Sequence, residues 1–135
     1  MQLRALLLPQ LARFSDEALL ALRVIVGAFL IWGVQDNILS EERMQEFVEF
    51  CAANGFPAPH VMAPLSVYTQ FICGALLFVG LFTRLAGIVM TGHFIIAVLM
   101  VHLHQDFRGQ WPALALVFIC AYFAPRGAGR WSVDR

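Results

Sequence analysis

Four long apolar runs separated by polar turns dominate the chain, and they cover about residues 18–35, 64–82, 85–103 and 110–124. A helix needs about 20 apolar residues to cross the hydrocarbon core of a bilayer, which is about 30 Å thick. The first three runs suit that thickness, whereas the fourth is short and must recruit flanking residues or lie where the bilayer thins. The alternation typical of membrane β-strands is missing, so the pattern predicts four transmembrane helices.

A fifth helix is predicted over about residues 41–54, in the only sizeable loop, which joins the first two spans. Ser40 is a favourable N-cap and Gly55 is well placed as a C-cap. One face of this helix would carry Met44, Phe47, Val48 and Cys51, and Glu42, Glu46 and Glu49 would lie away from it. We therefore expect an amphipathic helix on the bundle or on the membrane surface. The predicted fold class is all-α: one domain, residues 1–135, forming a transmembrane four-helix bundle with this extra helix in the external loop.

The composition agrees with a membrane protein. Hydrophobic residues make up 60% of the 135 residues and charged residues only 13%, against about 25% charged residues in a typical soluble domain. The net charge is zero, so the chain lacks the basic character that attracts nucleic acid. The three cysteines are isolated, and Cys73 and Cys120 lie within apolar runs, where a thiol usually packs as a small apolar group.

The basic residues indicate the orientation of the chain in the membrane. The chain has no lysine, and most of its arginines fall on one side of a four-span topology. These are Arg4, Arg13, Arg84, Arg126, Arg130 and Arg135, whereas Arg43 and Arg108 fall on the other side. Because positively charged loops tend to stay in the cytoplasm, we expect a multi-pass protein of the bacterial inner membrane with both termini cytoplasmic and the acidic helix outside.

Several short stretches occur in an order that resembles the DoxX family of small bacterial membrane proteins. They are LRVIVGAFLIWG in the first span, EFCAANGFPAP at the end of the external loop, GALLFVGLFTRLAG between the second and third spans, and GAGRWSVD at the C-terminus. The resemblance covers most of the chain and implies a four-helix membrane fold. It also implies an association with membrane redox systems, such as thiosulfate and quinone oxidation or oxidative-stress complexes.

The chain departs from the family pattern at two positions. Many relatives carry a basic residue just after the first span, where this chain has Asp36. Many also carry a glutamate in the outer part of the second span, where Gln70 takes its place. If those residues carry proton or ion chemistry in relatives, that chemistry is altered here. The resemblance therefore implies the fold more directly than the function.

Arg23 stands about five residues into the first span, where a charged group in the membrane needs a partner. Near the cytoplasmic end, its long side chain can reach polar groups at the interface. Asp134 in the C-terminal tail is a candidate partner, since both residues lie on the cytoplasmic side of the expected topology. Arg23 could therefore clamp the tail to the bundle, or it could bind an anionic ligand such as a lipid phosphate or a quinone head group.

The third span carries a stripe of imidazole and thioether side chains at helical spacing. The stripe consists of Met90, His93, Ala97, Met100 and His104. Such ligands suit copper or haem iron, but His93 and His104 would be about 16 Å apart along one helix and could not share an ion. We therefore expect no metal site.

His93 is instead the leading candidate for contact with a ligand. An apolar slot beside it could hold a quinone, with His93 or Gln70 donating a hydrogen bond. The aromatic wall of this slot would consist of Tyr68, Phe71 and Trp32. The alternative is an interhelical hydrogen bond from His93 to a carbonyl group, to Thr91 or to Tyr122, and such bonds average under about 1 kcal/mol in membranes.

His102 and His104 mark the external end of the third span, and with Glu42, Glu46 and Glu49 they are the candidates for an interface. No set of nucleophile, base and acid is apparent, so we do not expect the chain to be an enzyme on its own. The prediction is an accessory or quinone-interacting subunit of a membrane redox system, embedded in lipid, with a redox partner subunit or further copies of itself as conceivable partners. The alternatives are a small-molecule-binding or lipid-binding protein or transporter, and a scaffold that holds partner proteins through its acidic helix.

Overall fold

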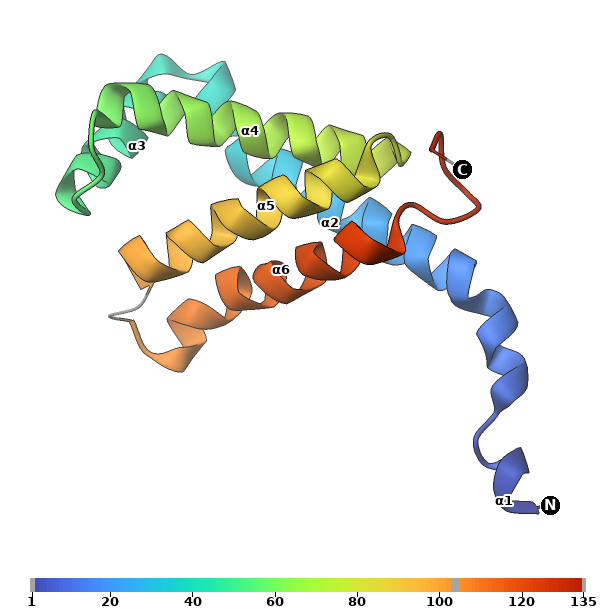
Figure 1. The fold of residues 1–135 in the computed structure, drawn as a ribbon. Helices are drawn as coiled ribbons and strands as arrows, with labels where there is room; N and C mark the ends of the chain where they lie inside the picture. The colour runs from blue at the N-terminus through green and yellow to red at the C-terminus, as the bar shows by residue number, and fades with distance from the viewer. Residues whose placement is uncertain (1, 103–104, 135) are drawn as a thin grey trace.

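The computed structural model describes residues 2–102 and 105–134, apart from the side chains of Gln2 and His102. Every regular element in these residues is a helix (Figure 1). The long helices are α2 (Ser15–Leu39), α4 (Pro59–Val79), α5 (Thr83–Ala97) and α6 (Phe107–Arg126), and α3 (Glu41–Ala53) lies between α2 and α4. The shorter pieces are α1 (Gln2–Ala5), a 3₁₀ helix at Pro9–Phe14 and a π-helical turn at Val98–His102 that follows α5.

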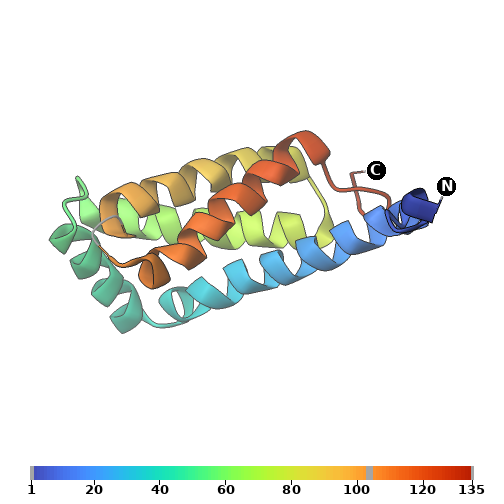
Figure 2. The ribbon, with the colours of Figure 1, turned by 90° about the horizontal axis from the view of Figure 1, so that it is seen from below.

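The four long helices run up and down in the order of the chain, and they pack mainly as two pairs, α2 with α4 and α5 with α6 (Figures 1 and 2). One end of the bundle holds the start of α2, the turn between α4 and α5, and the C-terminal tail, residues 127–134. We call this the tail end. The other end holds α3 and the start of α6, and we call it the α3 end. The short helices before α2 lead away from the tail end (Figure 1).

Within the described residues, four helices are long and apolar enough to cross a membrane: α4, α5 with its π-helical turn, α6, and α2 together with the short segments before it. Large apolar side chains such as Ile25 and Phe118 are exposed on their outer surfaces. A continuous apolar exterior of this kind suits lipid rather than water. The prediction of an all-α chain with four helices able to span the membrane is confirmed.

Two of the helices, α3 and α6, begin directly after a residue whose side chain caps them. Ser40 Oγ at the start of α3 and Asp106 Oδ1 at the start of α6 each accept a hydrogen bond from the backbone N–H three residues later. Pro112 and Pro125 lie near the two ends of the fourth apolar run, and both are inside α6. A proline removes one backbone hydrogen bond, and helices in lipid tolerate that loss. The last helix is therefore 20 residues long and needs no thinned bilayer.

Glycines set the spacing within the helix pairs. Where α2 crosses α4, a Cβ atom added to Gly27 would lie 2.6 Å from the carbonyl oxygen of Gly74. Where α5 meets α6, a Cβ atom added to Gly87 would lie 2.8 Å from the carbonyl oxygen of Cys120. Helices in lipid associate largely through such close backbone packing, because lipid tails are as apolar as the side chains. These contacts therefore set how closely α2 approaches α4 and how closely α5 approaches α6.

Candidate functional site

An apolar cavity of about 720 Å³ lies at the α3 end, between α2, α3, α4 and α5. Its aromatic lining consists of Phe47 and Phe50 from α3, Phe56 from the turn that follows, and Phe94 from α5. Its polar lining consists of Asn37, Ser66, Thr69, Gln70 and His93. Sites for small molecules have this character, with mostly apolar walls and a few polar groups that orient the ligand.

His93 is held by Ser66 across the hairpin of α4 and α5, with 2.7 Å between His93 Nε2 and Ser66 Oγ. The ring of Phe94 stands edge-on to the imidazole, with 4.9 Å between the ring centroids. The second ring nitrogen, Nδ1, is buried and has no hydrogen-bond partner in the part of the chain that the structure describes. A buried polar atom without a partner costs about 1–3 kcal/mol. A ligand that forms a hydrogen bond with Nδ1 would remove this cost.

The partner of His93 differs from the side chains that the sequence suggested. Thr91 Oγ1 donates to the carbonyl oxygen of Gly87 in its own helix, at 2.6 Å, and Tyr122 is exposed on α6. The sequence could have identified Ser66 as the partner from its position relative to the turn between α4 and α5. Ser66 stands 14 residues before Gly80 and His93 stands 13 residues after it, so an antiparallel helical hairpin that turns at Gly80 brings the two to the same level.

Gln70 also lines the cavity, and it ties α4 to α2. Its Nε2 donates to the carbonyl oxygen of Leu30 at 3.2 Å. Gly33 leaves the space for this side chain, since a Cβ atom added there would lie 3.3 Å from Nε2. A primary amide has two N–H donors, so one N–H of Gln70 remains available to a ligand.

The aromatic wall is not the one predicted from the sequence. Trp32 is 68% exposed, and neither it nor Tyr68 nor Phe71 lines the cavity. Successive residues of a helix point about 100° apart, and the wall of the cavity is formed instead by Gly33 and Val34, next to Trp32. The aromatic rings come mainly from α3 and the turn after it, because α3 covers this end of the cavity.

Cys51 of α3 is another side chain on the cavity wall, and it is buried. Burial raises the pKa of its thiol. The nucleophilic form of cysteine is the thiolate, so Cys51 is held in its unreactive form and contributes apolar surface to the wall.

The acidic interface candidates lie on the outside of α3, away from the cavity. Glu42, Glu46 and Glu49 are all exposed, and Glu46 pairs with Arg43 at 3.3 Å. The other two interface candidates are not placed here, because the side chain of His102 and all of His104 lie outside the described residues.

The predicted stripe on the third span does not form one surface, since Met100 is exposed outside both the core and the cavity. Met90 is fully buried in the helical core, whereas His93 lines the cavity. Among residues 2–102 and 105–134, apart from the two side chains noted above, no three His, Cys, Asp or Glu side chains come together as metal ligands.

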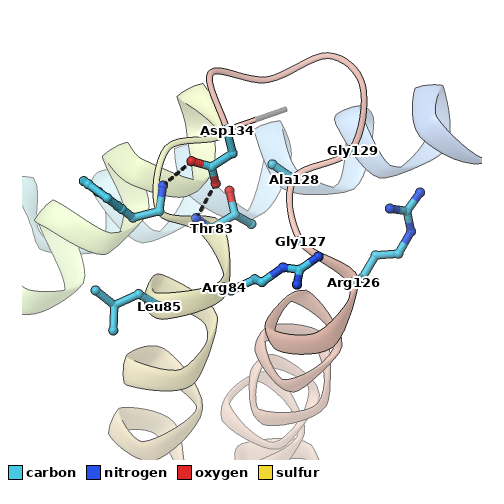
Figure 3. Close-up of a pocket in the computed structure, with 9 residues that line it drawn as sticks. Thr83, Arg84, Leu85, Arg126, Gly127, Ala128, Gly129 and Asp134 are labelled. Atoms are coloured by element: carbon cyan, nitrogen blue, oxygen red, sulfur yellow. Dashed lines mark hydrogen bonds between the residues drawn. The ribbon is translucent and has the colours of Figure 1, made fainter.

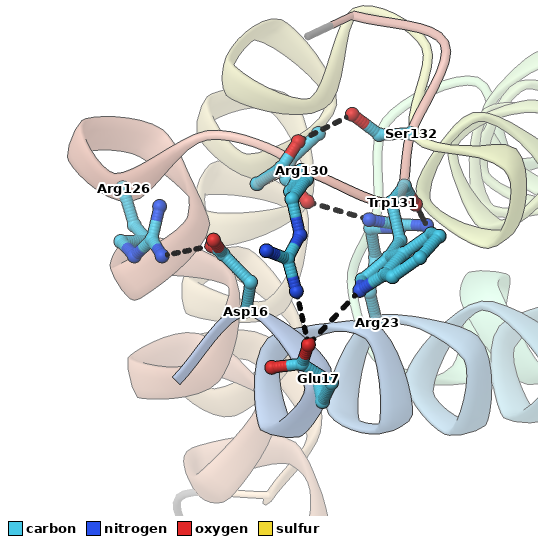
Figure 4. A network of polar contacts seen from close by, with 9 residues as sticks. Asp16, Glu17, Arg23, Arg126, Arg130, Trp131 and Ser132 are labelled. Atoms are coloured by element: carbon cyan, nitrogen blue, oxygen red, sulfur yellow. Dashed lines mark hydrogen bonds and ion pairs between the residues drawn. The ribbon is translucent and has the colours of Figure 1, made fainter. Parts of the chain in front are cut away.

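At the tail end, Arg23 is 1% exposed and joins three parts of the chain (Figure 4). Its Nε donates to the carbonyl oxygen of Leu77 at 2.7 Å, its Nη1 to that of Ala128 at 2.6 Å and its Nη2 to that of Trp131 at 2.7 Å. These bonds clamp α2 to the end of α4 and to the tail. They also engage all three guanidinium nitrogens, so Arg23 presents no accessible surface to an anionic ligand.

Asp134, the expected partner of Arg23, caps α5 instead. Its two carboxylate oxygens accept hydrogen bonds from the backbone N–H groups of Phe82 at 2.7 Å and Thr83 at 2.8 Å (Figure 3). Burial raises the pKa of the Asp134 carboxyl, but the hydrogen bonds from Thr83 and Phe82, with the nearby charge of Arg23, outweigh burial and lower the pKa below its ordinary value. The ionised carboxylate therefore pins the tail to the start of α5.

Two ion pairs add to these contacts between α2 and the C-terminal residues (Figure 4). Arg126 Nη2 donates to Asp16 Oδ1 at 2.8 Å. Glu17 Oε1 accepts from Arg130 and, at 3.4 Å, from the indole nitrogen of Trp131. The tail is thus attached to α2, α4 and α5 at once, and it closes this end of the bundle.

Comparison with known proteins agrees with this architecture. A model of the DoxX family matches residues 18–103, which is more than half of the chain. The chain belongs to the DoxX family. This DoxX protein is a multi-pass integral membrane protein in contact with the lipid bilayer, and the matched region includes nearly all of the residues that line the α3-end cavity. No curated protein and no solved structure matches the chain.

Proposed function

We propose that this DoxX protein binds a membrane quinone in the α3-end cavity and acts as an accessory subunit of a membrane redox system. The observation that carries the proposal is the unpaired Nδ1 of His93, a residue that lines a mostly apolar cavity. A quinone ring is flat and apolar, and its carbonyl oxygens accept hydrogen bonds. The association of the family with membrane redox systems supports the same assignment.

The pair of His93 and Ser66 can supply the hydrogen bond that a quinone needs. If the Ser66 hydroxyl donates to Nε2, the imidazole proton resides on Nδ1. Nδ1–H is then free to donate to a quinone carbonyl, and the buried nitrogen gains a partner. Gln70 can give a second hydrogen bond through the N–H that Leu30 does not use.

We infer that the cavity opens to the side of the bundle, on the surface formed by α4 and α5. Leu65, Ile88 and Ile96 line it and are also exposed on the outside of the bundle, Ile88 by 60%. This surface belongs to helices long and apolar enough to span the membrane, so the opening leads into the hydrocarbon phase. A ligand with a long apolar tail can place its ring in the cavity and leave the tail in the bilayer, as the isoprenoid chain of a quinone requires.

Titration of the purified protein with a short-chain quinone analogue tests the proposal. His93→Leu is expected to weaken binding by about fivefold, because a hydrogen bond contributes about 1 kcal/mol. Gln70→Leu should act in the same direction. Calorimetry in detergent measures both affinities, and variants that bind as tightly as the wild type would show that the proposed donors are wrong.

A blocking variant and its control complete this experiment. Gly92 lines the cavity, and a Cβ atom added to it would meet no atom within 4 Å. Gly92→Phe should therefore fill the cavity and abolish binding without disturbing the helix packing. Ile95→Phe is the matched control, because Ile95 is exposed on the same helix and does not line the cavity. Equal binding by both variants would place the ligand elsewhere.

We also propose that both termini face the cytoplasm of a bacterial cell and that α3 lies outside its inner membrane. The arginines at the tail end, including Arg84, Arg126 and Arg130, support this orientation through the positive-inside rule. With a membrane-impermeant maleimide, Gln45→Cys should be labelled in intact spheroplasts, whereas Val133→Cys should be labelled only after permeabilisation. The three native cysteines are buried and give a low background. Labelling of Val133→Cys alone in intact spheroplasts would reverse the orientation.

A further inference from the structure

A second cavity, of about 610 Å³, lies at the tail end, where α5 begins and α6 ends (Figure 3). Its lining combines the first residues of the tail, Gly127 to Gly129, with the side chains of Arg84, Arg126 and Asp134. Because the helices that form it are long enough to span the membrane and end here, the cavity stands at the level of the lipid head groups.

Arg84 is the unusual residue of this cavity. Its side chain reaches from α5 toward Gly127, at the end of α6 (Figure 3). A Cβ atom added to Gly127 would lie 2.9 Å from Arg84 Nε, and the φ angle of Gly127 is +76°. Glycine at 127 therefore suits both the backbone and the guanidinium beside it. Arg84 makes no hydrogen bond or ion pair with any described residue, so its five N–H donors are unused.

The other charged groups of the cavity already have partners. Arg126 pairs with Asp16, and both oxygens of Asp134 are engaged by backbone N–H groups at the start of α5. The Thr83 hydroxyl is fully buried beside the Asp134 carboxylate, and it helps to lower the pKa of that carboxyl. The cavity therefore offers one unpaired positive charge, that of Arg84.

We propose that the tail-end cavity binds a phosphate group through Arg84, with Arg126 as a further donor. A guanidinium matches two phosphate oxygens at once and is less strongly hydrated than an ammonium group. Arg23, the sequence-based candidate for this role, is closed off by its three carbonyl partners. The phosphate could belong to an anionic phospholipid or be a free ion. Phe82 and Leu85 favour the phospholipid, because both line the cavity and are exposed where acyl chains would lie.

Lipid retention by the protein in nonionic detergent tests this assignment. Native mass spectrometry with short-chain phosphatidylglycerol should show one tightly retained lipid on the wild type. Arg84→Gln should weaken retention by about fivefold, since an arginine near a membrane surface contributes about 1 kcal/mol to the binding of anionic lipid. Arg13→Gln is the matched control: it removes an equal charge from an exposed side chain at the tail end, outside the cavity.

Two further ligands distinguish an anionic phospholipid from free phosphate as the ligand of this cavity. Diacylglycerol has the same acyl chains without the phosphate and should be retained weakly and equally by wild type and Arg84→Gln. Inorganic phosphate that binds as tightly as the lipid, with the same dependence on Arg84, would assign the site to the free ion. Equal losses of phosphatidylglycerol in Arg84→Gln and Arg13→Gln, or tight retention of diacylglycerol, would overturn the proposal. None of these results depends on quinone binding at the α3 end.

Discussion

Gly27→Ala is expected to destabilise the bundle by about 1 to 3 kcal/mol, the usual cost of overpacking, although alanine is the better helix former. The added methyl group would lie 2.6 Å from the carbonyl oxygen of Gly74 and 2.8 Å from the backbone nitrogen of Phe78. Both atoms belong to the backbone, so no side-chain rotation relieves the clash and α2 must move away from α4. That movement would strain every contact of the pair, including the hydrogen bond from Gln70 to Leu30.

Gly92→Ala is the matched control for this substitution. It adds the same methyl group at another helical glycine, where no atom lies within 4 Å. Helix propensity changes equally in the two variants, by up to about 1 kcal/mol, so their difference isolates the clash. Unfolding by SDS in mixed micelles measures both. Equal stability of the two variants would show that α2 and α4 do not cross at Gly27.

The number of helices could be predicted from the sequence because each crossing of the membrane needs a long apolar run, and hydropathy records that directly. Ser40 could also be recognised from the sequence as an N-cap. The ends of α6 could not be predicted, because they depend on Asp106 as the N-cap and on whether a proline stops a helix or only interrupts one hydrogen bond. Pro125 illustrates the difference: it stands at the end of the apolar run, yet it lies inside α6.

The candidate sites were harder to predict because helices in lipid are apolar on most sides. Their hydropathy does not show which way each helix is rotated. His93 and Gln70 stood out as polar residues in apolar runs, and both line the cavity. Trp32 could not be placed without the rotation of α2, and it faces outward.

The hydrogen-bond partners of Arg23 could not be predicted from the sequence, for a different reason. Its position in a span indicated that it needs a partner, and Asp134 was the natural choice by charge. The structure gives it three backbone carbonyl oxygens instead. Every residue carries a carbonyl group, so no sequence pattern marks these acceptors. Only the path of the tail brings two of them to Arg23.

Arg23→Met is expected to release the C-terminal tail and to lower the stability of the bundle by about 3 kcal/mol or more. Methionine has a similar length, but it cannot donate to the carbonyl oxygens of Leu77, Ala128 and Trp131. A buried carbonyl without a donor costs about 1–3 kcal/mol, and hydrogen bonds to charged groups contribute about 1.5–3 kcal/mol. The carbonyl oxygens of Ala128 and Trp131 can regain hydrogen bonds only if the tail lifts into water. The loss of stability should therefore appear together with exposure of the tail.

Cysteine labelling measures that exposure directly. Ala128 is 5% exposed, so the thiol of Ala128→Cys should react slowly with maleimide in the otherwise wild-type protein and many times faster when Arg23→Met is added. Arg130→Gln is the control, because it removes an exposed ion pair with Glu17 and leaves the Arg23 clamp intact. Exposed ion pairs contribute little, so this variant should label slowly and unfold almost as the wild type does. Slow labelling and unchanged stability in Arg23→Met would show that Asp134 and the ion pairs hold the tail without the clamp.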